Sequence, residues 1–163
     1  MRPLISERSS LLKRRLLAAV SALQTVEGVN QDKIGAIGFC FGGLCALDLA
    51  RHRIGLKAAV SFHGTLTAIP ELELDHIDTS IQVHHGDADP HIKAESVAEF
   101  MQEMRTRKAD WSFISYGNAQ HGFTEPRRIW KRSAATLTEK CCFNQCPLTE
   151  IHKMCCPETR PKG

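Results

Sequence analysis

The segment Lys33-Ile-Gly-Ala-Ile-Gly-Phe-Cys-Phe-Gly-Gly43 joins two kinds of apolar pattern. Residues 34–38 form a short apolar run, which predicts a buried strand, and the apolar run 44–50 predicts a helix that continues to about residue 53. The pattern Gly-x-Cys-x-Gly-Gly between them predicts a very sharp turn. Cys40 in this turn would lie at the N-terminus of the helix.

The chemistry of this turn makes Cys40 a candidate nucleophile. We expect that the flanking positions Gly38 and Gly42 tolerate almost no side chain, and that Gly43 completes the turn. Free N–H groups and the helix dipole favour a thiolate at Cys40, while the N–H of Phe41 would point toward the oxyanion of an acyl intermediate. A small core cysteine at a strand end is the alternative that this segment alone leaves open.

The pattern on both sides of the turn alternates between strands and helices. Further strands are predicted at 56–62, 80–84 and 111–116, and helices at about 12–23 and 93–108, with a surface loop over 65–79. Such succession indicates right-handed βαβ units. We therefore predict an α/β fold with about four parallel strands and flanking helices.

The amino-acid composition excludes few classes of protein. The 163 residues suffice for one domain, and 42% hydrophobic residues with a net charge of +3 are ordinary for a globular protein. Lys and Arg are mostly scattered and there is one Tyr, so nucleic-acid binding is not expected. The basic residues followed by apolar residues at 13–23 imitate a signal peptide, but the apolar residues have the spacing of a helix. No apolar run in the sequence is close to the length of a membrane-spanning helix. A nucleophilic thiol must be reduced, so we expect a soluble, cytoplasmic protein.

Three loops that follow predicted strands carry reactive side chains. Cys40, Asp89 and His121 occur in the chain order nucleophile, acid, histidine, and Asp87 is a second candidate acid in the same loop. The carboxyl ends of parallel strands meet at one edge of the sheet, where the chemistry of such folds lies.

Four stretches in order, GFCFGG, VSFHG, HGDADPHI and SYGNAQHGFTEP, resemble the dienelactone hydrolase family over about residues 32–126. The resemblance implies a partial α/β-hydrolase fold and a Cys40–His121–Asp89 triad. Asp89 is preferred over Asp87 because Gly86, Asp89 and Ile92 fit the family pattern Gly-x-x-Asp-x-x-(Val/Ile). It also implies hydrolysis of activated ester or lactone bonds in a small carboxylated molecule, with no metal or organic cofactor.

Competing interpretations of the same residues are less well supported. Four histidines near the predicted sheet edge invite a metal site, but none has a carboxylate or thiol at a recognised ligand spacing: His63, His84, His85 and His91. The glycine-rich turn lacks the spacing of a nucleotide-binding loop. Aromatic residues around the turn would pack beside it or line a substrate pocket: Phe39, Phe41 and Phe62.

The two ends of the chain depart from the family pattern. Only 39 residues precede Cys40, so we expect residues 1–126 to form a partial domain in which strand 34–38 is an exposed edge that self-associates. We expect residues 127–163 to be a basic, Cys-rich and poorly ordered tail, for which a zinc module is the weaker interpretation. The alternative function is that of a catalytically weak fragment acting as an interaction or regulatory protein.

Overall fold

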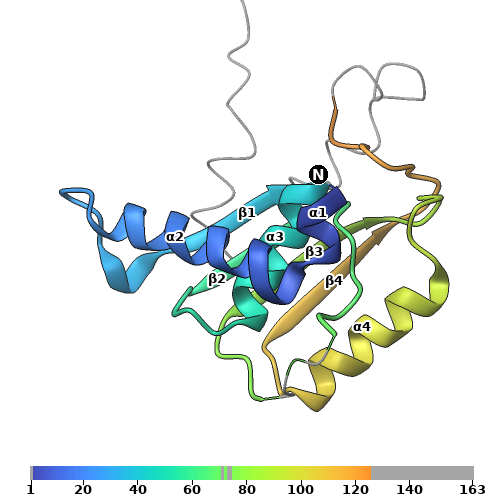
Figure 1. Cartoon of the computed structure of the whole chain (residues 1–163). Coiled ribbons are helices and arrows are strands. Elements are labelled where there is room, and N and C mark those ends of the chain that lie inside the picture. The colour runs from blue at the N-terminus through green and yellow to red at the C-terminus, as the bar shows by residue number, and fades with distance from the viewer. Residues whose placement is uncertain (1, 71, 73–74, 126–163) are drawn as a thin grey trace, which may run out of the picture. The chain divides into compact units, whose positions relative to one another are not determined.

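Four parallel strands, in the spatial order β1-β2-β3-β4, form the sheet (Figure 1). The structure is a computed structural model, and it describes residues 2–70, 72 and 75–125. The strands are β1 (Gly35–Phe39), β2 (Ala58–Phe62), β3 (Ser80–Gly86) and β4 (Trp111–Tyr116). The helices are α1 (Arg2–Ser6), the π-helical segment η1 (Arg8–Leu12), α2 (Lys13–Gln24), the 3-10 turn η2 (Gln31–Lys33), α3 (Phe41–Arg51) and α4 (Ala94–Thr106).

The predicted elements are confirmed with shifts of a few residues at their ends. The first helix is longer than predicted, since α1, η1 and α2 follow one another with almost no break. The unit that carries the sheet spans Met1–Phe123. The predicted tail, residues 127–163, lies outside the described residues.

One face of the sheet carries the core. Strand positions on this face, such as Ala59, Ile81 and Val83, pack against α3 and α4. Next to them, Leu49 of α3 and Ile34 form a second cluster with residues of α2. The helices that pack on the described sheet therefore lie on one face of it.

The segment 65–79 is a loop, but the prediction that it lies on the surface is wrong for its apolar residues. Its described residues form no helix or strand, yet several are buried: Leu66, Ile69, Ile77 and Thr79. Leu66 and Ile77 belong to the main core. The described acidic residues of the segment, Asp75 and Asp78, are exposed and lie next to these buried anchors.

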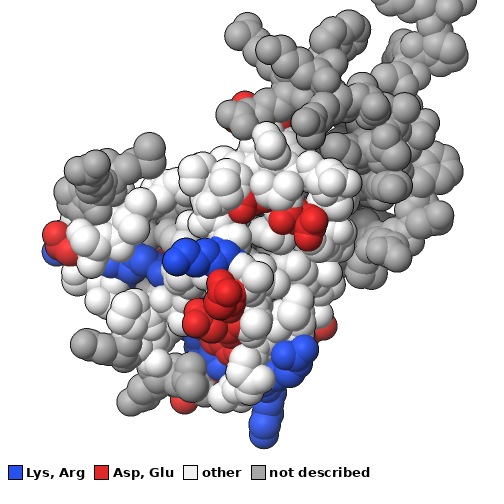
Figure 2. All heavy atoms as spheres, turned by 90° about the vertical axis from the view of Figure 1, so that its right-hand side faces the viewer, with Lys and Arg blue, Asp and Glu red and all other residues white. Residues whose placement is uncertain are grey.

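Buried charges join η1 to α3 and α3 to α4. Arg8 of η1 donates two hydrogen bonds to Asp48 of α3, at 2.9 and 2.6 Å. Asp48 also pairs with Arg51, which pairs in turn with Glu103 of α4 at 2.8 Å. Each charge has a partner, so the desolvation cost of burying it is offset by the pairing. Elsewhere, Figure 2 shows acidic and basic side chains interspersed on the face it displays.

β1 is an outer strand of the described sheet. It pairs with β2 on one side, and no described strand lies on the other. Its two large apolar side chains on the face away from α3 remain exposed, Ile37 by 44% and Phe39 by 49%. None of the described helices combines the length and apolar character that a membrane span requires.

Candidate active site

The turn between β1 and α3 is as sharp as its glycines predict. Cys40, the residue before α3, has φ 53° and ψ −117°, a strained conformation for a residue with a side chain. A Cβ at Gly38 would overlap the carbonyl of Gly42, and one at Gly43 would lie 2.6 Å from Ser61 Oγ. These two glycines let α3 start directly against β1 and β2.

The expectation for Gly42 is wrong. A Cβ at this position would meet no other atom within 4 Å, and its φ is not positive. The backbone of Gly42 lies so close to Gly38 that position 38 has no room for a side chain. The steric requirement for glycine therefore falls on Gly38 and Gly43.

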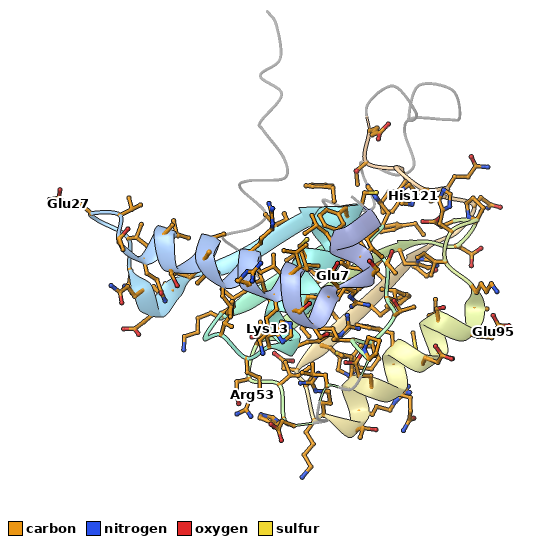
Figure 3. The ribbon with its side chains drawn as sticks, in the orientation of Figure 1. Glu7, Lys13, Glu27, Arg53, Glu95 and His121 are labelled. Carbon is orange, nitrogen blue, oxygen red and sulfur yellow. The ribbon has the colours of Figure 1, made fainter. Side chains whose placement is uncertain are left out.

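The structure brings together the three side chains predicted from separate loops. His121 Nε2 lies 3.2 Å from Cys40 Sγ, and His121 Nδ1 lies 2.8 Å from Asp89 Oδ2. His121 lies at the end of the sheet toward which the strand arrows point (Figure 3). A histidine that contacts a thiol through one nitrogen and a carboxylate through the other has the arrangement of a general base with a fixed tautomer.

The two candidate acids occupy different environments. The Asp89 side chain is 0% exposed, and its second oxygen accepts the N–H of His91 at 2.9 Å. Asp87 is exposed, and its backbone N–H donates to the carbonyl of Tyr116. Of the two, Asp89 is the one whose carboxylate contacts His121.

The environment of Cys40 includes a free backbone donor. Phe41 is the first residue of α3, so its N–H has no acceptor within the helix. Cys40 itself is exposed, whereas Cys45, one turn further along α3, is half-buried. Burial, with a smaller contribution from Asp48, raises the pKa of the Cys45 thiol to about 11. The two described cysteines thus differ sharply in access and surroundings.

The four histidines considered for a metal site do not gather. His84 and His85 are buried in β3, and desolvation lowers the pKa of both, that of His84 to about 4. His91 instead lies near Asp89 and His121, and ligand atoms of these three lie within 4.8 Å of one another. Two of these three residues, Asp89 and His121, are already joined by the 2.8 Å hydrogen bond.

Aromatic rings form a stack across the ends of the strands. Phe39 stacks on Phe62 at a centroid distance of 4.8 Å, Phe62 on His84 at 4.4 Å, and His84 on Tyr116 at 5.9 Å. Tyr116 Oη also lies 2.7 Å from His84 Nδ1. Phe39 and Phe62 therefore pack together beside the turn, as expected.

Sequence reasoning missed the position of His63. It follows β2 directly, is buried, and its Nδ1 accepts the backbone N–H of Cys40 at 3.2 Å. The only signal in the sequence was its place after a strand within the stretch VSFHG.

Comparison with known proteins identifies a family and several relatives that this chain resembles. The model of the dienelactone hydrolase family matches residues 1–142. An uncharacterized protein of Caenorhabditis elegans is 54% identical over 123 residues, which cover 74% of this chain and 78% of that protein. A Bradyrhizobium protein named "Probable 2-oxo-3-(5-oxofuran-2-ylidene)propanoate lactonase" is 33% identical over 117 residues, 66% of this chain and 47% of the relative.

A similar solved structure is the dienelactone hydrolase-like promiscuous phosphotriesterase P91 from metagenomic libraries. It superposes with a TM-score of 0.72 at 38% identity, over 77% of this chain and 52% of that one. The chain thus spans most of the nematode protein but about half the length of these other relatives.

Proposed function

The chain belongs to the dienelactone hydrolase family, a family of hydrolases with the α/β-hydrolase fold, and from this premise we propose that it cleaves activated ester or lactone bonds through Cys40, His121 and Asp89. The observation that carries the proposal is the pair of contacts made by His121. Its Nε2 lies 3.2 Å from the Cys40 sulfur and its Nδ1 lies 2.8 Å from the Asp89 carboxylate.

The first half of the proposed reaction forms an acyl-enzyme. His121 Nε2 takes the proton of Cys40 Sγ, and the resulting thiolate attacks the acyl carbon. Negative charge develops on the carbonyl oxygen, to which the N–H of Phe41 donates a hydrogen bond. The bond to the leaving oxygen then breaks, and that oxygen takes the proton from His121.

The second half returns the enzyme to its starting state. His121 removes a proton from water, the hydroxide attacks the thioester carbon, and the Cys40 sulfur leaves and is reprotonated. Asp89 accepts a hydrogen bond from the Nδ1–H of His121 throughout, and this bond keeps Nε2 directed at the sulfur. These steps use only side chains, the backbone and water.

The family and one named relative support the proposed substrate class. The Bradyrhizobium protein is named for a lactonase acting on a propanoate, and we infer that this chain likewise acts on a small carboxylated ester or lactone. The aromatic stack that ends at Phe39, the residue before Cys40, is compatible with a planar, conjugated acyl group.

The experiment compares the two described cysteines. Cys40→Ala should lower turnover of p-nitrophenyl acetate by about a thousandfold or more, whereas Cys45→Ala should retain it. A brief iodoacetamide pulse at pH 7 followed by peptide mapping should label Cys40 well before Cys45, because the raised pKa keeps the Cys45 thiol protonated. Turnover that survives Cys40→Ala would contradict the proposal.

A further inference from the structure

We infer that His63 is a positioning residue, which holds the backbone of the nucleophile through one contact and the ring of the catalytic histidine through another. The inference rests on the proposed function, since it concerns the same Cys40 and His121. The two contacts are made with the backbone of Cys40 and with the ring of His121.

The first contact fixes the nucleophile turn. The backbone N–H of Cys40 donates to His63 Nδ1 at 3.2 Å, and it also donates to the carbonyl of Phe62 at 3.0 Å. Cys40 has a positive φ, which a residue with a side chain adopts only when its surroundings hold it. The hydrogen bond to His63 Nδ1 therefore helps to stabilise the strained backbone of Cys40.

The second contact restrains the base. The rings of His63 and His121 meet edge to face, with centroids 4.9 Å apart and an interplanar angle of 65°. His63 also meets Phe123 edge to face, at 5.5 Å. A ring packed against the imidazole limits its rotation, and rotation would carry Nε2 away from the Cys40 sulfur.

His63 is itself held firmly enough to do this. It is buried, its φ is 40°, and its backbone N–H donates to the carbonyl of His84 at 2.9 Å. The next residue, Gly64, has no room for a Cβ, because such an atom would lie 2.8 Å from the backbone of Gly43. Strain of this kind gathers at functional sites.

The two contacts have different chemical requirements. The first needs an acceptor on Nδ1, which His63 offers only while that nitrogen is unprotonated. The second needs a flat ring. Asn at position 63 can supply the acceptor without the ring, Phe can supply the ring without the acceptor, and Ala supplies neither.

The experiment measures two quantities in the whole chain and in the His63→Asn, His63→Phe and His63→Ala variants. One is the pH at which Cys40 alkylation by iodoacetamide reaches half of its maximum rate, which reports the Cys40–His121 pairing. The other is turnover of p-nitrophenyl acetate. Circular dichroism and thermal melting establish that each variant is folded.

The loss of each contact should change a different one of these two quantities. His63→Asn should raise the alkylation midpoint, because His121 loses one of its two edge-to-face ring contacts and keeps only that with His91. His63→Phe should keep the midpoint near that of the wild type and lower turnover about tenfold, because the turn loses its acceptor. His63→Ala should show both changes, with turnover lowered on the order of a hundredfold. If His63→Ala does not fold, the Asn and Phe variants carry the test.

Folded variants that keep both values within twofold of the wild type would overturn the inference, as would equal losses in all three. Neither result would touch the proposed function, provided that wild-type Cys40 is reactive and turns over ester. A wild-type protein with an unreactive Cys40 and no turnover would overturn the proposed function, and this inference with it.

Discussion

Among single residues, the loop after β3 offers two aspartates, and their positions determine which of them pairs with His121. Asp89→Asn should lower ester turnover by orders of magnitude with little change in melting temperature, because an amide cannot hold the same tautomer of His121. Asp87→Asn is the matched control, since Asp87 is exposed two residues away. Equal and small effects of both substitutions would contradict the assignment.

The glycines around Cys40 make a second residue-scale prediction. Gly38→Ala should destabilise the fold by several kcal/mol, because its methyl group would overlap the Gly42 carbonyl and the helix would have to move. Gly42→Ala should be neutral or slightly stabilising, since its Cβ meets open space near the start of a helix. Chemical denaturation measures both, and a Gly38→Ala variant as stable as the wild type would refute the packing described for the turn.

At the scale of elements, β3 carries a histidine that should make stability depend on pH. Burial lowers the pKa of His84 to about 4, whereas the unfolded chain titrates near the ordinary value of 6.5. Between these values the unfolded state binds more protons than the folded state, so stability falls as pH drops from about 6.5 toward 4. The expected loss between pH 7 and pH 5 is about 2 kcal/mol from His84 alone. His85, whose pKa burial also lowers, acts in the same direction.

Urea denaturation at the two pH values tests this prediction. His84→Gln is the control, because glutamine can still bond the Tyr116 hydroxyl but does not titrate. The loss between pH 7 and pH 5 should shrink in this variant. A wild-type chain and a His84→Gln chain with the same pH dependence would show that His84 is not responsible.

At the scale of the whole molecule, we propose that two copies of the chain associate through β1. This strand has no described neighbour on its outer side, and its N–H and C=O groups there can pair with a second β1. Ile37→Lys should reduce association in sedimentation velocity experiments, because a charge on an edge strand opposes pairing. Val26→Lys, at a similarly exposed apolar position outside the sheet, should not. A wild-type chain that stays monomeric at all concentrations would contradict the proposal.

Much of the fold follows from patterns that are local in the sequence. Stretches of five to seven residues, either apolar or alternating between apolar and polar, marked the strands, and the apolar run after Gly43 marked α3, because such patterns depend on near neighbours in the chain. The order of strands and helices implied a parallel sheet, whose carboxyl ends collect the loops. The motif at Cys40 and its resemblance to one family supplied the candidate residues.

Other features depend on contacts between residues that are distant in the sequence, and these could be seen only in the folded chain. Which glycines are sterically required depended on where α3 packs, so Gly43 mattered and Gly42 did not. The loop over residues 65–79 proved to be anchored by buried apolar side chains. Arg8 pairs with Asp48, forty residues away, and His63, which follows β2, contacts both Cys40 and His121. Local patterns in the sequence therefore predicted the elements and the reactive side chains. Packing determined which side chains meet, because burial and hydrogen bonding join residues that no local pattern relates.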